Sequence, residues 1–109
     1  MAQNELSPDA KTLKALAEAG SDLAKPHDIN HWLYFSSESD ARAAAEELDA
    51  TGYTIDSVAL SPDSKQWRVL ALKTIVPTLA EVERTSAYLE DLALRHHGDY
   101  DGWETQVED

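Results

Sequence analysis

The sequence predicts an α+β fold in which helices cover one face of a four-stranded sheet. Four segments with alternating apolar residues are separated by segments whose apolar residues recur at helical spacing. The order of these segments is one helix, then β-α-β-β-α-β, which is the split β-α-β or ferredoxin-like arrangement with an extra N-terminal helix. The predicted strands are 29–35, 53–60, 67–76 and 100–107.

Helix boundaries are predicted from capping residues. Ser7 is expected to cap the first helix, with Pro8 at its first position and Gly20 at its end. We expect residues 1–7 to form a flexible N-terminus and residues 8–109 to form a single domain. The second helix is expected to be capped by Ser39 and to end at Gly52. The third is expected to be capped by Thr78, which forms a capping box with Glu81, and to end at Gly98.

Two strands are expected at the centre of the sheet. Right-handed crossovers place the first and third strands in the middle, and these two are apolar on both faces. In the first strand, Trp32 and Tyr34 share one face while Ile29, Leu33 and Phe35 share the other. Since helices cover only one face, the aromatics on the other must meet the N-terminal helix, a second subunit or a partner.

The charge of the chain is strongly negative. Its 109 residues include 21 acidic and 9 basic side chains, giving a net charge of −12. An acidic field repels nucleic acid and attracts cationic partners, so we expect no direct contact with RNA or DNA. The alternative is that an acidic surface only keeps the protein soluble.

Composition also limits the cellular setting. The chain has no cysteine, which excludes disulfides, thiolate metal sites and cysteine nucleophiles. No apolar run is long enough for a membrane helix, and the N-terminus lacks the features of a signal peptide. We therefore expect a cytoplasmic protein without a membrane contact.

Metal binding and catalysis are both disfavoured. The candidate metal ligands are His27, His31, His96 and His97. The fold places His96 and His97 near Phe35, too far along the strand from His31 for the imidazole rings to bind one ion. We interpret His31 as a sheet residue with a hydrogen-bond partner and His96 as a residue at a helix C-terminus. The adjacent carboxylates Glu46 and Glu47 are expected on the solvated side of a helix, without a pocket to shift a pKa. The prediction is a protein that is not an enzyme and has no cofactor or metal.

The closing segment Tyr100-Asp101-Gly102-Trp103 combines a turn-forming pair with two large aromatic residues. Gly102 favours a positive φ angle, so a kink or β-bulge is expected in an edge strand beside the first strand. Trp103 is expected to pin the sheet. A structural role and a role in partner contact both stay open for this segment.

Several motifs together resemble a known family. Gly20-Ser21-Asp22, Ile29-x-His31-x-Leu33, Gly52-Tyr53 and Tyr100-Asp101-Gly102-Trp103 are similar to the ribonuclease E inhibitor family, also called regulator of ribonuclease activity B. The resemblance covers nearly the whole chain in order, with the last motif its most specific part. Better-known members continue into a long acidic tail, whereas this sequence stops at Asp109.

The resemblance implies a ferredoxin-like, cytoplasmic, non-enzymatic protein that binds and inhibits an RNase E-type endoribonuclease and slows RNA decay. The implied partner surface is the basic, arginine-rich, non-catalytic region of that ribonuclease, and a homodimer stays open. The alternative is a dimeric small-molecule-sensing module that uses the aromatic sheet face. Expected partner-binding residues are Glu38, Asp40, Glu46, Glu47, Asp49, Asp99, Asp101, Trp103 and Glu104, with the tail acids Glu108 and Asp109.

Overall fold

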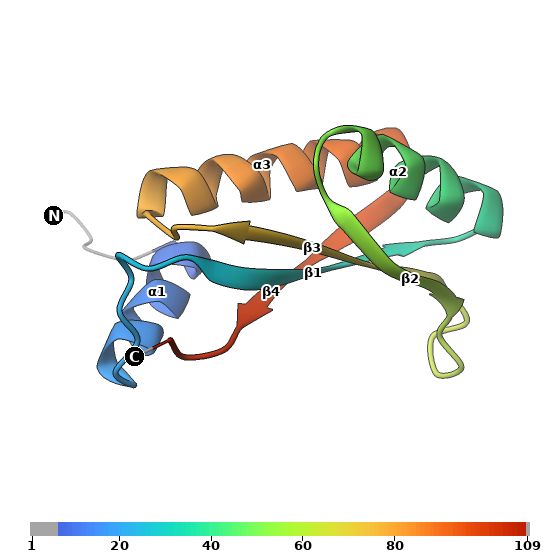
Figure 1. Cartoon of the computed structure of the whole chain (residues 1–109). Helices are drawn as coiled ribbons and strands as arrows, with labels where there is room; N and C mark the ends of the chain where they lie inside the picture. Colours follow the sequence, from blue (N-terminus) through green and yellow to red (C-terminus); the bar gives the residue numbers. More distant parts are fainter. Residues whose placement is uncertain (1–6, 109) are drawn as a thin grey trace, which may run out of the picture.

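A computed structural model describes residues 7–108 and shows three helices and one four-stranded antiparallel sheet (Figure 1). The expectations for residues 1–6 and for Asp109 lie outside the described residues. In chain order the elements are α1 (Pro8–Glu18), β1 (His27–Phe35), α2 (Glu38–Ala50), β2 (Thr54–Leu60), β3 (Trp67–Ile75), α3 (Leu79–Arg95) and β4 (Gly98–Thr105).

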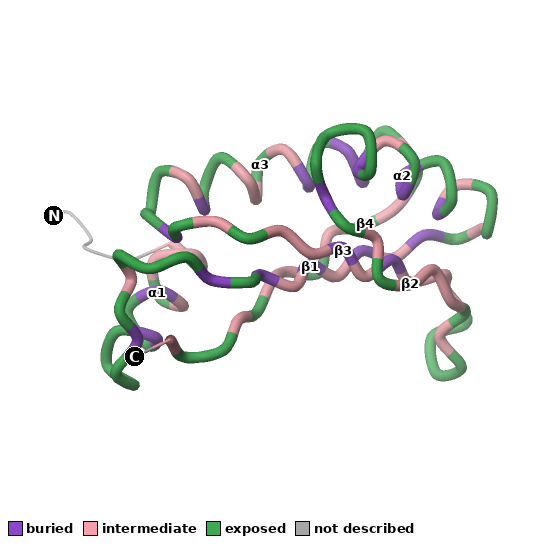
Figure 2. The backbone as a smooth tube through the Cα atoms, viewed as in Figure 1, coloured by how far each residue is buried: buried purple, intermediate pink, exposed green. Residues whose placement is uncertain are grey.

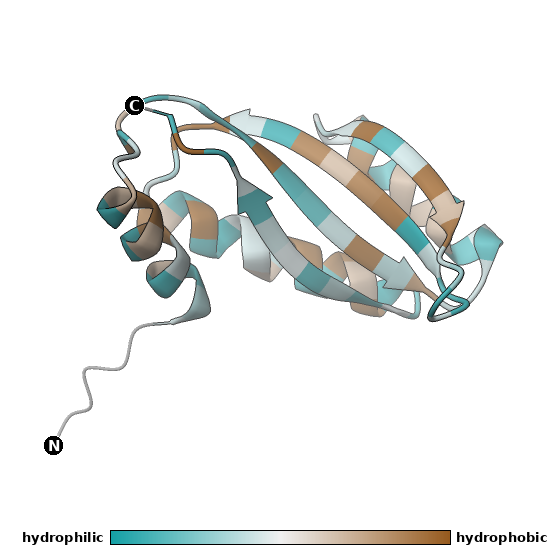
Figure 3. Ribbon diagram, turned by 90° about the horizontal axis from the view of Figure 1, so that it is seen from below, coloured by the Kyte–Doolittle hydropathy of each residue, from teal (hydrophilic) through white to brown (hydrophobic). Residues whose placement is uncertain are grey.

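The sheet has the strand order β2-β3-β1-β4, and every neighbouring pair is antiparallel. The predicted central position of β1 and β3 is confirmed, as is the place of β4 at the edge beside β1. Both α2 and α3 lie on the same face of the sheet (Figure 1). Seen from below, the other face has no helix across it within residues 7–108 (Figure 3).

The main core lies between the sheet and the helices α2 and α3, which carry buried segments, coloured purple in Figure 2. Leu33 and Phe35 of β1 are fully buried against Leu48 of α2 and Leu89 of α3. Alanines on α2, including Ala41 and Ala44, let that helix approach the sheet closely. The core therefore fixes which face of β1 points inward.

A second, smaller cluster attaches α1 to one end of this sandwich. Leu13 and Leu16 of α1 pack with Val82 of α3, and Ile75 and Trp103 of the sheet complete the cluster. Because α1 is bound at this end, it does not cover the open face of the sheet (Figure 3). The N-terminal helix therefore does not cover the aromatic face, and a second subunit and a partner remain as the alternatives.

Two of the predicted caps are confirmed. The Ser7 hydroxyl accepts a hydrogen bond from the Ala10 amide, and the Thr78 hydroxyl accepts one from the Glu81 amide, at 3.1 and 3.2 Å. Pro8 occupies the first turn of α1 as predicted. The predicted capping box does not form, because the Thr78 amide donates to the Val76 carbonyl and the Glu81 carboxylate accepts from Arg84.

Two other boundaries were predicted wrongly. Ser37, not Ser39, caps α2, because Ser37 has an extended backbone and lies three residues before the Asp40 amide that it binds. At the end of α3 the left-handed residue is His97, with φ of 63°, rather than Gly98. Gly98 begins β4, where a Cβ atom would lie 2.4 Å from the Tyr34 carbonyl oxygen.

Candidate interaction surface

The expected partner-binding residues fall into two groups on different layers of the molecule. One group lies on α2 in the helix layer, and the other lies on β4 at the edge of the sheet. The groups approach each other where His97 lies, since its Nδ1 is 3.5 Å from a carboxylate oxygen of Asp40 and Asp99 follows two residues later. The α2 group is Glu38, Asp40, Glu46, Glu47 and Asp49; the β4 group is Asp99, Asp101, Trp103 and Glu104.

Within the α2 group, Glu46 and Asp49 are exposed, as expected for the solvated side of a helix. Glu38 forms an exposed ion pair with Arg42 one turn later, at 2.8 Å. Such exposed pairs add little to stability, so these side chains contribute mainly to the negative field around α2.

Glu47 is half-buried, unlike its exposed neighbour Glu46. Its carboxylate accepts two hydrogen bonds from the guanidinium of Arg95, at 2.8 and 3.1 Å, and a third contact, at 2.9 Å, joins it to Nε2 of His96. The Arg95 and His96 hydrogen bonds lower the pKa of Glu47 to about 2. The expectation that nothing shifts the pKa of Glu47 was therefore wrong, because Arg95 and His96 at the end of α3 bind its carboxylate.

The β4 group is built around a β-bulge. Trp32 of β1 pairs with Gly102 and Leu33 pairs with Tyr100, so Asp101 is the additional residue. Gly102 has φ of 111°, a conformation that side chains with a Cβ rarely adopt. The predicted bulge is confirmed, and Asp101 and Glu104 are both exposed beside it.

Trp103 holds α1 against the sheet. Its indole N–H donates a hydrogen bond to the Asp9 carboxylate at 2.8 Å, and its ring packs on the cluster around Leu13 and Leu16. The structural interpretation of the closing motif therefore has a specific basis: Gly102 forms the bulge and Trp103 docks α1. Asp101 of the motif and Glu104, which follows it, are both exposed.

The open face of the sheet carries half-buried aromatic and aliphatic side chains. Trp32 and Tyr34 lie there beside Leu70 and Leu72 of β3. The Arg68 guanidinium lies over the Trp32 ring at 5.3 Å, a cation–π arrangement that sequence patterns did not indicate. Only the register of β1 with β3 places these two residues together.

His31 is the polar exception on the covered face. It is 2% exposed, and its Nδ1 is hydrogen-bonded to the Tyr100 hydroxyl at 3.0 Å, which confirms its interpretation as a sheet residue with a partner. Burial, with the nearby charge of Lys73 adding to it, lowers the pKa of His31 to about 4. His31 is therefore neutral at physiological pH.

The other histidines have separate partners. His27 bonds the Ser21 hydroxyl and the Lys25 carbonyl, His96 bonds Glu47, and His97 lies near Asp40. Within residues 7–108 no group of three or more histidine or carboxylate side chains could hold a metal ion. In the same part of the chain, no helix has the length and apolar content needed to span a membrane.

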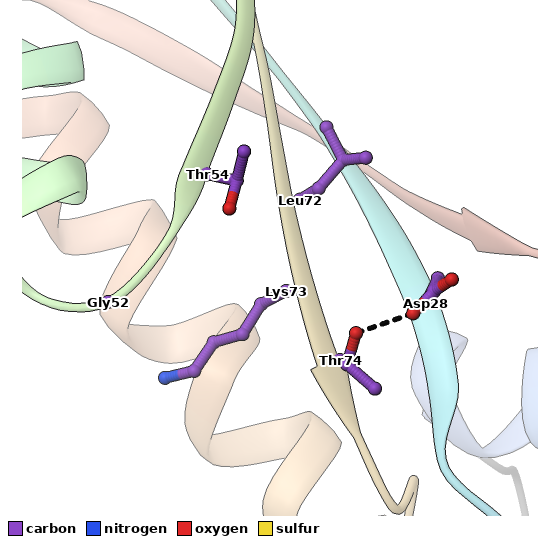
Figure 4. A pocket seen from close by; sticks show the side chains of 6 residues that line it. All are labelled: Asp28, Gly52, Thr54, Leu72, Lys73 and Thr74. Atoms are coloured by element: carbon purple, nitrogen blue, oxygen red, sulfur yellow. Dashed lines mark hydrogen bonds between the residues drawn. The ribbon is translucent and has the colours of Figure 1, made fainter.

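One hollow lies at the β2–β3 side of the sheet (Figure 4). It measures about 480 Å³, and the Thr74 hydroxyl at its edge donates a hydrogen bond to Asp28. Asp28 and Lys73 are the charged residues of its lining, and the Lys73 ammonium lies 4.8 Å from the Tyr53 ring centroid.

Fold and surface together define a class: an acidic α+β protein whose uncovered sheet face carries aromatic and acidic side chains. Residues 7–105 match the family described as regulator of ribonuclease activity B. Because the match spans most of the sequence, the chain belongs to this family, as its motifs indicated. The family assignment implies a role in regulating ribonuclease activity. No curated protein matches the chain.

Proposed function

We propose that the chain is a non-catalytic regulator that binds and inhibits an RNase E-type endoribonuclease. The observation that carries this proposal is the family match over residues 7–105. Within the proposal, the partner surface is the basic non-catalytic region of the ribonuclease, the setting is cytoplasmic, and the chain makes no direct contact with nucleic acid. No cofactor takes part.

Charge complementarity supports the choice of a basic partner region. The chain has a net charge of −12, and Glu46 and Asp49 on α2 are exposed. Acids of this kind accelerate the encounter with a cationic partner, and salt screens the effect. We assign this steering role to the α2 group and close contact to the β4 group.

Inhibition is tested by RNA cleavage. Purified chain is added to an E-type ribonuclease, either complete or lacking its basic non-catalytic region, and the rate of substrate loss is measured. The complete enzyme should be slowed in a dose-dependent way, while the shortened enzyme should not. Unchanged cleavage by the complete enzyme would contradict the proposal, and equal slowing of both enzymes would contradict the choice of partner region.

The steering role is tested by charge reversal. Changing both Glu46 and Asp49 to Lys should slow association with the ribonuclease several-fold at low salt and much less at high salt. Glu47 is excluded because it binds Arg95, so its reversal would disturb the packing of α2 on α3. The matched control changes Glu18 and Asp63, two exposed acids outside the proposed surface, to Lys. An equal loss in the control would show that only net charge matters.

We further propose that the fold is ferredoxin-like with an extra N-terminal helix, and that residues 8–109 form one domain. The element order and the strand order β2-β3-β1-β4 support this classification.

A second candidate function is a small-molecule-sensing module that acts as a dimer. The observation that favours it is the hollow of about 480 Å³ beside Thr54 and Leu72 (Figure 4). Its size suits a small ligand. A thermal-shift screen with amino acids and nucleotides tests this alternative, since a saturable rise in Tm is expected only of a sensor.

A further inference from the structure

A second hollow, of about 400 Å³, lies on the open face of the sheet where β1 and β4 run side by side. Two aromatic side chains come from β1, and two carboxylates come from β4. Arg68, which belongs to β3, does not line it. The lining residues are Trp32, Tyr34, Asp101, Gly102, Trp103 and Glu104.

The bulge in β4 creates this hollow. Gly102 is the residue paired with Trp32, and a Cβ atom placed on it would meet nothing within 4 Å. The β4 position beside the Trp32 ring is therefore empty, while the additional residue Asp101 brings a carboxylate to the rim. Glycine at this position permits the backbone turn and also leaves the space open.

The lining fits one kind of side chain. Aromatic faces attract planar cations, and paired carboxylates bind a guanidinium through charge-assisted hydrogen bonds. The molecule already contains one such contact, since the Arg68 guanidinium lies 5.3 Å from the Trp32 ring centroid on the β3 side. The β4 side of the same aromatic pair offers the carboxylates that Arg68 lacks.

We propose that this hollow binds an arginine side chain of an extended basic segment, with the guanidinium between Trp32 and Tyr34 and the carboxylates of Asp101 and Glu104. The identity of the partner rests on the proposed function; the binding of arginine does not. A second copy of this chain is a poor occupant, because its carboxylates would face these carboxylates. RNA is disfavoured by the same charges.

The test uses a fluorescently labelled ten-residue peptide of alternating arginine and serine, with anisotropy as the readout of affinity. Glu104→Gln should weaken binding at least threefold, and Trp32→Ala at least fivefold. Trp32→Phe, which keeps an aromatic face, should recover most of the loss. Glu46→Gln on α2 makes the same change in net charge as Glu104→Gln and should alter affinity less than 1.5-fold. A direct charge-assisted hydrogen bond contributes more to affinity than a distant charge that salt screens.

Ligand chemistry is tested with two further probes. A lysine peptide of equal charge should bind at least threefold more weakly, because an ammonium is not planar. Equal binding of the two peptides, equal losses from Glu46→Gln and Glu104→Gln, or tight binding of a single-stranded RNA at Trp32 would each overturn the proposal. Circular dichroism confirms that each variant is folded.

The peptide experiment and the cleavage experiment fail separately. If the peptide binds at Trp32 and Glu104 while the complete ribonuclease is unaffected by the chain, the inference holds and the proposed function fails. If the chain inhibits the ribonuclease and Trp32→Ala and Glu104→Gln inhibit equally well, the proposed function holds and the inference fails.

Discussion

The two faces of strand β1 differ in what their side chains contact. On the covered face, Leu33 and Phe35 are fully buried between the sheet and the helices. On the open face, Trp32 and Tyr34 are half-buried, with carboxylates of β4 nearby. Neighbouring residues on one strand thus belong to different environments, because side chains alternate between faces.

This difference separates stability from recognition. Side chains on the covered face remove apolar surface from water, which is the main source of folding free energy. Side chains on the open face leave apolar and charged groups accessible to another molecule. Substitutions on the covered face should therefore lower stability, and substitutions on the open face should weaken binding.

The largest effect is expected from Leu33→Ala. Removing a fully buried leucine side chain should lower the free energy of unfolding by about 3 kcal/mol, as the cavity left behind is only partly filled. Trp32→Ala should cost no more than about 1 kcal/mol, since its ring is partly exposed. Urea unfolding measures both. Equal costs would mean that the open face belongs to the core.

The second effect is a pH dependence that arises on the covered face. The pKa of His31 is about 4 in the folded chain against 6.5 normally, so only the unfolded chain takes up this proton as pH falls from 6.5 to 4. Stability should therefore fall, with about 2 kcal/mol of the loss between pH 7 and 5 due to His31. His31→Gln should show a pH dependence smaller by that amount; an unchanged slope would contradict the assignment.

Gly102→Ala tests the bulge that shapes the open face. The φ angle of 111° disfavours alanine, so the free energy of unfolding should fall by about 1 kcal/mol. The added methyl group should also narrow the hollow and weaken the arginine peptide. Thermal melts and peptide anisotropy measure the two effects. A variant with unchanged stability would show that the bulge does not depend on glycine.

The smallest effect is expected from Glu47→Gln. Losing the charged acceptor for Arg95 and His96 should lower Tm by a few degrees at pH 7. Because the pKa of Glu47 is lowered to about 2, the carboxylate stabilises the fold above its normal pKa and loses this effect as pH falls toward 2. The difference in Tm between Glu47→Gln and the unchanged chain should therefore be smaller at pH 3 than at pH 7. Glu46→Gln is the control, with no change in Tm expected at pH 7.

Much of the fold could be predicted because its signals are local. Alternation in 29–35 and 67–76 identified the central strands, and the positions of Ser7 and Thr78 identified two caps. The bulge at Gly102 followed from glycine's tolerance of positive φ. Ser37 and Ser39 could not be ranked as caps, since both are serines close to the same helix start.

The surface was less predictable because its contacts join distant parts of the chain. Glu47 binds Arg95, Trp103 binds Asp9, and Arg68 lies over Trp32, and no pattern in the sequence pairs them. The acids were expected on the second helix and on the edge strand, but the contacts that bind some of them and leave others exposed were not. Those contacts depend on register and on helix orientation, which only the folded chain defines.

The central claim is that the open face of the sheet is the binding face. The most direct test is to titrate the ¹⁵N-labelled chain with the basic region of the ribonuclease and to follow backbone amide shifts by NMR. The account predicts the largest changes at Trp32, Tyr34 and residues 101–104, with small changes along α2 and α3. Large changes confined to the helix layer, with the open face unaffected, would contradict it.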